Sequence, residues 1–198
     1  MISLLLDSAN RDLNIGLSQD DKIFDCISYT AWQRQSELMV KEIDVLLKRN
    51  NLSAKDIDEL IVTIGPGSYT GIRIALTIAK TLAFALHKKI YAISSLAAQR
   101  IVDKKTITVI NARSNRSYVA IYDGDGTVLV EEKVWPNDEL LGWVNNGSRD
   151  FVISGDAKYL GIDAYNPDVL QGMLEARKYT KAVDNVLTLK PIYLKDLL

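Results

Sequence analysis

The sequence predicts an α/β fold made of two similar units, and three observations support this prediction. Short runs rich in apolar and β-branched residues alternate with longer amphipathic stretches along the 198 residues. The order strands, helix, strand occurs in both halves of the chain, although no residue-level repeat is visible. The charged segment Asp103-Lys104-Lys105 lies at mid-chain, and the strand pattern restarts after it. We therefore expect an N-terminal lobe over residues 1–103 and a smaller C-terminal α/β lobe over residues 104–198.

The N-terminal lobe is predicted to begin with three strands, Ile2–Leu6, Leu13–Leu17 and Ile23–Ser28. The segments between them are short and rich in turn formers, and such short spacing favours antiparallel hairpins. The run Leu4-Leu5-Leu6 shows no alternation, which is typical of a central strand buried on both faces. Further along, Ser53-Ala54-Lys55-Asp56 has the spacing of a capping box and predicts a short helix before a buried strand at Leu60–Ile64.

Two long helices are predicted in this lobe, and each has two apolar faces. The first follows Ser36 as its expected N-cap, and its narrower second stripe is Leu38 and Val45. Its broad face is formed by Met39, Val40, Ile43, Leu46 and Leu47. The second helix starts at Thr70 and has one arc at Ile72, Ala75, Leu76, Ala79, Leu82, Ala83 and Leu86, with Ile74, Ile78 and Ala85 nearly opposite. A helix that is apolar on two sides lies in the middle of a domain or at an interface.

The remaining elements repeat the pattern. Ser94-Ser95 is expected to cap a helix through about Val102, after a strand at Ile90–Ile93. The turn Asp123-Gly124-Asp125-Gly126 predicts a hairpin. The other expected strands are Thr106–Ile110, Tyr118–Tyr122, Val128–Val134 and Phe151–Ser154, with helices opening at Pro136 and over Asp168–Tyr179.

Charge and composition exclude several classes of function. The chain has 24 Lys and Arg against 25 Asp and Glu, so a net charge of −1 offers no basic footprint for nucleic acid or an anionic membrane. Strong RNA binding by this chain alone is therefore disfavoured. The single Cys26 and single His87 form neither an intramolecular disulfide nor an ordinary zinc site. No basic region precedes the first apolar run, and we count no apolar stretch of about 18 residues. We therefore expect a cytoplasmic protein.

The glycine-punctuated turn Gly65–Gly71 joins a buried strand to the second long helix. Three glycines at a helix N-terminus offer free N–H groups that suit phosphate. However, a Walker A loop needs Gly-Lys-Ser/Thr, and Ile72 follows Gly71 here. The alternative, which we favour, is a packing turn whose small residues let another backbone approach closely.

Other polar residues carry weaker signals. Asp7 and Ser8 stand where phosphate-binding hairpins of actin-like ATPases carry Asp-x-Gly-Thr, but the glycine is missing, and a carboxylate that caps the turn explains Asp7 equally well. Cys26 alternates with Phe24 and is expected in the core, and His87 is expected to bond free carbonyls at a helix end. Asn111, Arg113 and Arg116 form a polar cluster that is either an anion site or a solvated turn.

Several segments together resemble the family of the tRNA threonylcarbamoyladenosine biosynthesis protein TsaB, also called YeaZ. The most specific is Gly65–Arg73, with the sequence GPGSYTGIR. The others are Leu4–Ser8, Arg34–Leu38, Ile93–Leu96, Asn111–Arg113 and Pro191–Lys195. Two positions depart from the family pattern: Asn111 replaces the usual Asp, and Gln35 replaces a common His. The C-terminal lobe is also short for the family.

The resemblance implies an actin-like, ribonuclease H-like fold of the ASKHA superfamily in two lobes, with no catalytic ability of its own. It implies a heterodimer with the related catalytic subunit TsaD, an association with the ATPase TsaE, and tRNA contact only through the complex. ATP, Mg²⁺ and a metal are then expected on the partner subunits, and none on this chain alone. His87 is the only histidine, so the His-x-x-x-His metal motif of TsaD is absent.

We therefore interpret the chain as a partner subunit that binds and activates TsaD, or pairs with a second copy when TsaD is missing. The alternative is an ATP-binding or ATP-hydrolysing enzyme of the actin-like and sugar kinase superfamily that uses Asp7. The predicted vestigial nucleotide site is Asp7 and Ser8, and no catalytic or metal residue is expected. The predicted partner-binding residues are Ser36, Leu38, Val45, Gly67, Tyr69, Thr70, Gly71, Ile74, Ala75, Ile78 and Ala79.

Overall fold

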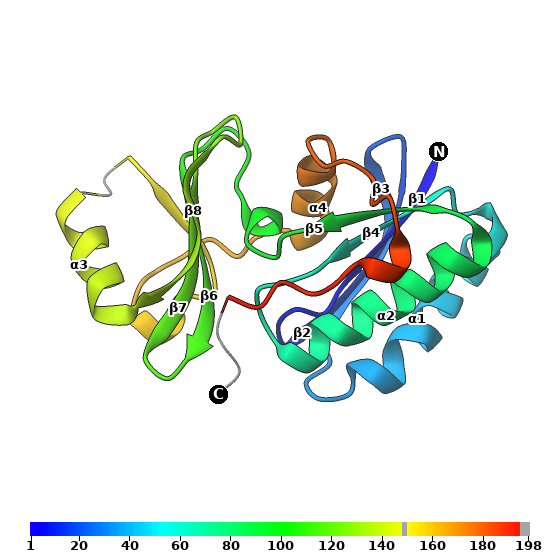
Figure 1. Cartoon of the computed structure of the whole chain (residues 1–198), viewed down its shortest axis with the longest axis horizontal. Helices are drawn as coiled ribbons and strands as arrows, with labels where there is room; N and C mark the ends of the chain where they lie inside the picture. The colour runs from blue at the N-terminus through cyan, green and yellow to red at the C-terminus, as the bar shows by residue number, and fades with distance from the viewer. Residues whose placement is uncertain (148–149, 195–198) are drawn as a thin grey trace.

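Two mixed β-sheets, one in each lobe, form the framework of the molecule (Figure 1). The computed structural model describes residues 1–147 and 150–194. The first sheet contains Ile2–Asp7 (β1), Asp12–Gln19 (β2), Lys22–Thr30 (β3), Glu59–Thr63 (β4) and Lys89–Ile93 (β5). Its order is β3-β2-β1-β4-β5, with antiparallel pairing among β1, β2 and β3 and parallel pairing of β4 with β1 and of β5 with β4.

The second sheet has the order β8-β7-β6-β9. Its strands are Thr106–Arg113 (β6), Arg116–Tyr122 (β7), Val128–Pro136 (β8) and Val152–Gly155 (β9). As in the first sheet, three strands pair antiparallel, and a strand that follows a helix returns parallel to the first of them. The predicted duplication of an α/β unit is therefore confirmed at the level of topology.

The central strands β1 and β4 of the first sheet are buried on both faces, which explains the uninterrupted apolar run of β1. Leu4 and Leu6 pack with the helices Gln35–Arg49 (α1) and Tyr69–Leu86 (α2). Leu5 points the other way, into a cluster with the helix Val169–Arg177 (α4). Figure 1 shows α1 and α2 together on one side of the sheet and α4 on the other. Adjacent residues of one strand thus supply both cores.

The C-terminal part of the chain returns to the first lobe. α4 packs on the first sheet, where Arg177 forms an ion pair with the buried Glu59 of β4 at 2.6 Å. Beyond it, residues 183–194, which we call the C-terminal strap, run beside α2 (red in Figure 1). The main-chain N–H of Val183 donates to Ile90, and that of Ile192 donates to Ile64 at 2.8 Å. Residues 104–198 therefore do not form one separate lobe, because the apolar residues of α4 and the strap are needed to cover the first sheet.

Several local expectations are corrected. α1 begins at Gln35 with Arg34 as N-cap, so Ser36 lies inside the first turn rather than capping it. The helix expected through Val102 is only a 3₁₀ turn at Ala97–Gln99. Cys26 is exposed on the edge strand β3 and is not a core residue. Lys195, the last residue of the closing family segment, lies outside the described residues.

α2 is also longer and more apolar than we counted from the sequence. By length and composition alone its 18 residues meet the criteria for a helix that could cross a membrane. Core helices meet the same criteria, and Ile72, Ala75, Leu76, Ala79 and Ala83 on one side of α2 are buried against the sheet. One third of the helix is buried in this way, which leaves its other faces to be explained.

Candidate functional site

The glycine turn packs against the chain's own β1–β2 turn. A Cβ atom on Gly67 would stand 2.3 Å from the carbonyl oxygen of Ala9, and one on Gly71 would stand 1.9 Å from that of Ser8. Hydrogen bonds hold the two turns together: Ser68 N–H donates to the Ala9 carbonyl at 2.7 Å, and Ser8 Oγ donates to the Gly71 carbonyl at 2.8 Å. The small residues admit a neighbouring backbone, as the packing interpretation expects. That backbone belongs to this chain and not to a partner.

The N-terminus of α2 is capped from within. Ser68 is the N-cap, and its Oγ accepts the Gly71 N–H at 3.3 Å. A capping hydroxyl occupies one of the N–H groups that would otherwise face an anion. The turn therefore offers a phosphate fewer donors than the sequence suggested.

Asp7 is a buried carboxylate whose two oxygens both have partners. Oδ1 accepts the Ala9 N–H at 3.2 Å and the Thr63 hydroxyl at 2.6 Å, and Oδ2 accepts the Asn14 amide at 2.8 Å. Burial raises the pKa of Asp7 above its ordinary value, because a charged carboxylate loses hydration there, and the hydrogen bonds from Thr63 and Asn14 oppose this shift. Asp7 thus caps the β1–β2 turn. Its neighbour Ser8 is fully buried against α2.

A cleft of about 1580 Å³ lies between the lobes, at the carboxyl ends of β1, β6 and β9. This is where α/β proteins place ligands, and Asp7, Asn111 and Asp156 line it from those three strand ends. Five carboxylates line the cleft against three basic side chains. No group of three or more His, Cys, Asp or Glu placed to hold a metal ion occurs among the residues of the described ranges. The lining is more suited to a neutral or cationic solute than to a bare triphosphate.

The polar cluster that follows β6 is a turn. Asn111 lines the cleft, and its Oδ1 accepts the Arg113 N–H at 2.8 Å. Arg113, Ser114 and Asn115 all have positive φ, which is typical of a tight hairpin connection. Neither Arg113 nor Arg116 is among the residues that line the cleft. The contacts match the solvated-turn interpretation.

The structure divides the predicted partner-binding residues into three groups. Gly71, Ala75 and Ala79 are buried between α2 and the sheet, which removes them from any partner surface. Leu38, Gly67, Ile74 and Ile78 are half-buried. Ser36, Val45, Tyr69 and Thr70 are exposed.

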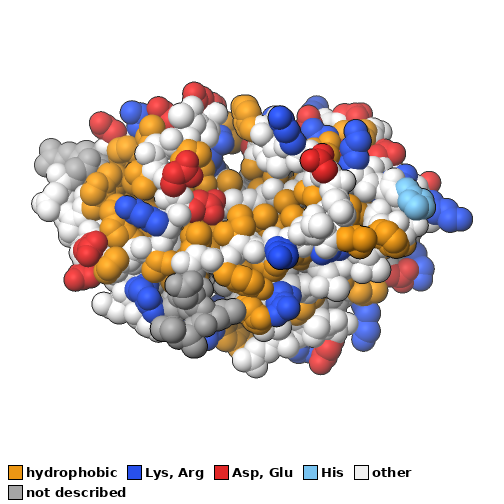
Figure 2. All heavy atoms as spheres, in the orientation of Figure 1, with side chains coloured by type: hydrophobic (Ala, Val, Ile, Leu, Met, Phe, Trp, Pro, Cys, Tyr) orange, Lys and Arg blue, Asp and Glu red, His pale blue; other side chains and the backbone are white. Residues whose placement is uncertain are grey.

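Two apolar residues that the sequence did not place at an interface are also exposed on these helices. Val40 on α1 is 57% exposed, although the periodicity put it on the core face, and Phe84 on α2 is 61% exposed. The signal for Phe84 was its position outside both apolar arcs of α2. We use the term outer helix face for the solvent side of these two helices, where Leu38 and Val45 lie on one flank of α1, Val40 lies on its other flank, and α2 contributes Ile74, Ile78 and Phe84. Figure 2 shows hydrophobic side chains over the middle of this side of the molecule and a further group of them beside the single histidine, His87, at the end of α2.

The C-terminal strap fixes one flank of α2. Tyr193 stacks on Tyr69 with ring centroids 5.1 Å apart, and the guanidinium of Arg73 lies over the Tyr69 ring. Lys80 Nζ donates to the carbonyls of Leu187 at 3.0 Å and Leu189 at 2.8 Å. This flank of α2 is covered by the chain itself, so the outer helix face is the part of α2 that remains open.

Comparisons with known proteins agree with this fold. A family model described as "TsaD: tRNA N6-adenosine threonylcarbamoyltransferase" matches residues 29–167, more than half of the chain. The tRNA threonylcarbamoyladenosine biosynthesis protein TsaB of Bacillus subtilis is 32% identical over 146 residues, which cover 71% of this chain and 62% of that protein. The chain thus matches less than two thirds of that relative's length.

Solved structures show the same architecture. YeaZ from Pseudomonas aeruginosa superposes with a TM-score of 0.79 and 21% identity, covering 98% of this chain and 99% of that one. An activator of 2-hydroxyisocaproyl-CoA dehydratase from Clostridium difficile, solved with bound ADPNP, superposes with a TM-score of 0.52 and 12% identity over 90% of this chain and 94% of that one. The expected actin-like fold class is confirmed. The chain therefore belongs to the family of the tRNA threonylcarbamoyladenosine biosynthesis protein TsaB, also called YeaZ.

Proposed function

We propose that this chain takes part in tRNA threonylcarbamoyladenosine biosynthesis as a non-catalytic partner subunit that binds and activates TsaD. The observation that carries the proposal is the outer helix face, on which Val40, Val45 and Phe84 are exposed and three further apolar residues are half-buried. Large apolar side chains that are exposed close together on a monomer commonly mark a binding site.

The relationship to TsaD supports a pairing of like helices. The chain matches a family model described as TsaD over residues 29–167, which include both α1 and α2. Two related subunits that share these helices can pair them across an approximate two-fold axis, because the same surface on each is then self-complementary. The same geometry serves a homodimer when TsaD is absent. A stable contact of this type buries about 1,000 Å² or more.

The absence of catalysis is part of the proposal, and the chemistry of the cleft supports it. Both oxygens of Asp7 already have protein partners, which leaves this carboxylate poorly placed to hold Mg²⁺. The phosphate-binding glycine of actin-like ATPases is replaced at Ala9. ATP, Mg²⁺ and a metal are then bound by TsaD and TsaE and not by this chain alone. We place the complex in the cytoplasm, with tRNA reached through the assembled subunits and no membrane contact.

Charge substitutions on exposed residues test the partner surface. Val45→Glu and Phe84→Glu alter side chains that are 48% and 61% exposed, so each variant keeps its fold. Val128→Glu is the matched control, because Val128 is 44% exposed on β8 in the other sheet. Burial of an unpaired carboxylate in the interface costs about 2 kcal/mol or more, so the Kd for TsaD is expected to rise roughly 30-fold or more. Co-purification and titration with TsaD measure this. Unchanged binding by both helix variants would refute the assignment.

A second candidate function is nucleotide binding in the interlobe cleft. The position of the cleft at three strand ends favours it, as does the fold shared with a protein solved with ADPNP. Calorimetric titration of ATP and Mg²⁺ into the isolated chain distinguishes the two. Tight binding that is lost in Asp7→Asn would establish the nucleotide site and overturn the view of a scaffold alone.

A further inference from the structure

The helix α2 and the C-terminal strap beside it carry positive charge without any acidic residue. The sequence contains no Asp or Glu between Glu59 and Asp103, and none in residues 185–194 of the strap. The basic residues of these two segments are Arg73, Lys80, Lys88, Lys89, Arg100 and Lys190. Because the whole chain has a net charge of −1, this part of it is basic against an acidic remainder.

The strap runs antiparallel to α2, so residues far apart in the sequence share one surface. Tyr193 stacks on Tyr69 in the first turn of α2, whereas Lys80, about three turns further on, donates to the carbonyls of Leu187 and Leu189. At about 100° per residue, Arg73 and Phe84 of α2 lie within about 60° of Tyr69 around the helix axis. We define the strap face as the exposed residues Tyr69, Arg73, Phe84, Leu187, Lys190 and Tyr193. Figure 2 shows basic side chains set among hydrophobic ones over the middle of this side of the molecule.

The cations of the strap face have no carboxylate partner. Within residues 1–147 and 150–194, no salt bridge involves a basic residue of α2 or of the strap. Arg73 donates to the Tyr69 hydroxyl and lies over its ring, and Lys80 bonds main-chain carbonyls, so both contact neutral groups. Charges left uncompensated in the free protein are available to an acidic partner.

A second copy of this chain is a poor source of the missing carboxylates. Its own α2 and strap supply none, and the exposed acids of its α1 are already engaged, since Glu37 pairs with Arg34 and Asp44 pairs with Lys48 at 2.8 Å. Pairing of two strap faces would bring like charges together, which disfavours that contact.

The other residues of the strap face are typical of a protein interface. Tyr and Arg are enriched where proteins bind one another, and Leu187 is 65% exposed although it is a large apolar residue. Its cations are also spaced singly among apolar side chains, whereas nucleic-acid sites gather Lys and Arg on one stripe. Building on the proposed pairing with TsaD, we propose that the partner interface continues from the outer helix face onto the strap face, which binds an acidic region of TsaD.

The salt dependence of association tests the charge of the partner. The rate of association with TsaD of the same organism is followed by stopped-flow fluorescence from about 0.01 M to about 1 M salt, over which the screening length falls from about 30 Å to about 3 Å. We expect this rate to fall about tenfold or more, while self-association measured by sedimentation is unchanged or strengthened. Binding of TsaD at a rate independent of salt would overturn this inference and leave the proposed function intact. No binding of TsaD at any salt concentration would refute both.

Two sets of exposed variants locate the effect on the strap face. The double variant Arg73→Glu, Lys190→Glu should lower the association rate about tenfold at low salt, and Lys104→Glu, Lys133→Glu in the second lobe is the control with the same change of net charge. Leu187→Ala should raise the Kd for TsaD about fivefold or more, and Leu129→Ala on β8 is its control.

Three outcomes would contradict the assignment. Equal slowing by both double variants would show an effect of net charge alone, and an unchanged Kd in Leu187→Ala would remove the strap from the interface. Salt-sensitive binding of tRNA to the isolated chain, abolished in Arg73→Glu, Lys190→Glu while TsaD associates normally, would assign the strap face to RNA instead.

Discussion

The same substitution, glycine to alanine inside a helix, should have opposite effects at Gly71 and Gly142. At Gly71 the new Cβ would lie 1.9 Å from the Ser8 carbonyl oxygen, where ordinary contacts are 3.4–4 Å, so the backbones must separate by about 1.5 Å. Overpacking of this kind costs roughly 1–3 kcal/mol, and the separation also strains two hydrogen bonds between the turns, at about 1 kcal/mol each. We therefore expect Gly71→Ala to lower the free energy of unfolding by about 3–5 kcal/mol.

Gly142→Ala meets no atom and should instead raise the free energy of unfolding by about 0.5–1 kcal/mol. For a chain of this size each kcal/mol moves Tm by about 2–4 °C, so the Tm values of the two variants should differ by roughly 10 °C or more. Urea denaturation followed by circular dichroism measures both. If Gly71→Ala were within about 1 kcal/mol of the wild-type protein, the packing explanation of the glycine turn would be wrong.

Two further predictions concern buried carboxylates. The pKa of Asp7 is raised in the folded protein, so the folded state loses stability relative to Asp7→Asn as the pH rises from about 4 towards neutrality. In Asp7→Asn the Asn14 amide turns over so that it still bonds residue 7. The free energy of unfolding of the variant should therefore rise relative to that of the wild-type protein as the pH increases. Curves that stay parallel over this pH range would contradict the prediction. Arg177→Ala leaves Glu59 buried without its ion pair and should cost about 3–5 kcal/mol in urea denaturation. Arg34→Ala, which breaks an exposed pair with Glu37, is the control and should change stability by less than about 1 kcal/mol.

Much of the fold could be predicted because it follows from local patterns. The β-branched runs and short turns located the strands, and the lack of alternation in Leu4-Leu5-Leu6 correctly indicated burial on both faces. Helical periodicity placed Ala75 and Ala79 on the arc that the structure buries. These patterns depend only on residues close together in one strand or helix, so they can be recognised in the sequence alone.

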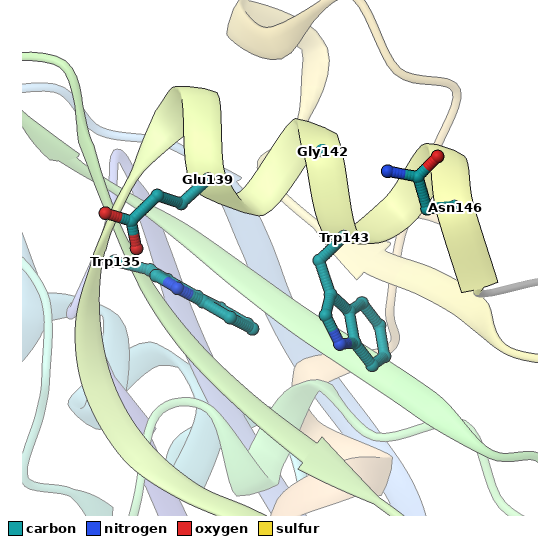
Figure 3. Close-up of a pocket in the computed structure, with 5 residues that line it drawn as sticks. All are labelled: Trp135, Glu139, Gly142, Trp143 and Asn146. Atoms are coloured by element: carbon teal, nitrogen blue, oxygen red, sulfur yellow. The ribbon is translucent and has the colours of Figure 1, made fainter.

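What could not be predicted depends on which distant segments meet. The small residues of the glycine turn indicated a close approach, but not that Ser8 and Ala9 of the same chain make it. Val40 lies on the edge of its helical face and is 57% exposed, which periodicity within one helix does not reveal. The pocket that contains Trp135 and Trp143 is formed by a strand end and by a residue nearly two turns into the following helix, Asn137–Gly147 (Figure 3). The outer helix face and its partner remain a prediction.

The C-terminal strap determines the order in which this protein can fold during synthesis. The first lobe is encoded almost entirely by the first half of the chain, yet Val183, Val186, Leu189 and Ile192 complete its apolar core. When the first five strands have emerged from the ribosome, the segment that completes their apolar core has therefore not yet been translated. Domains usually fold as they emerge, N-terminal part first. Here residues 183–192 are translated after the second lobe, so we expect a nascent chain stalled in that lobe to expose apolar surface along α2.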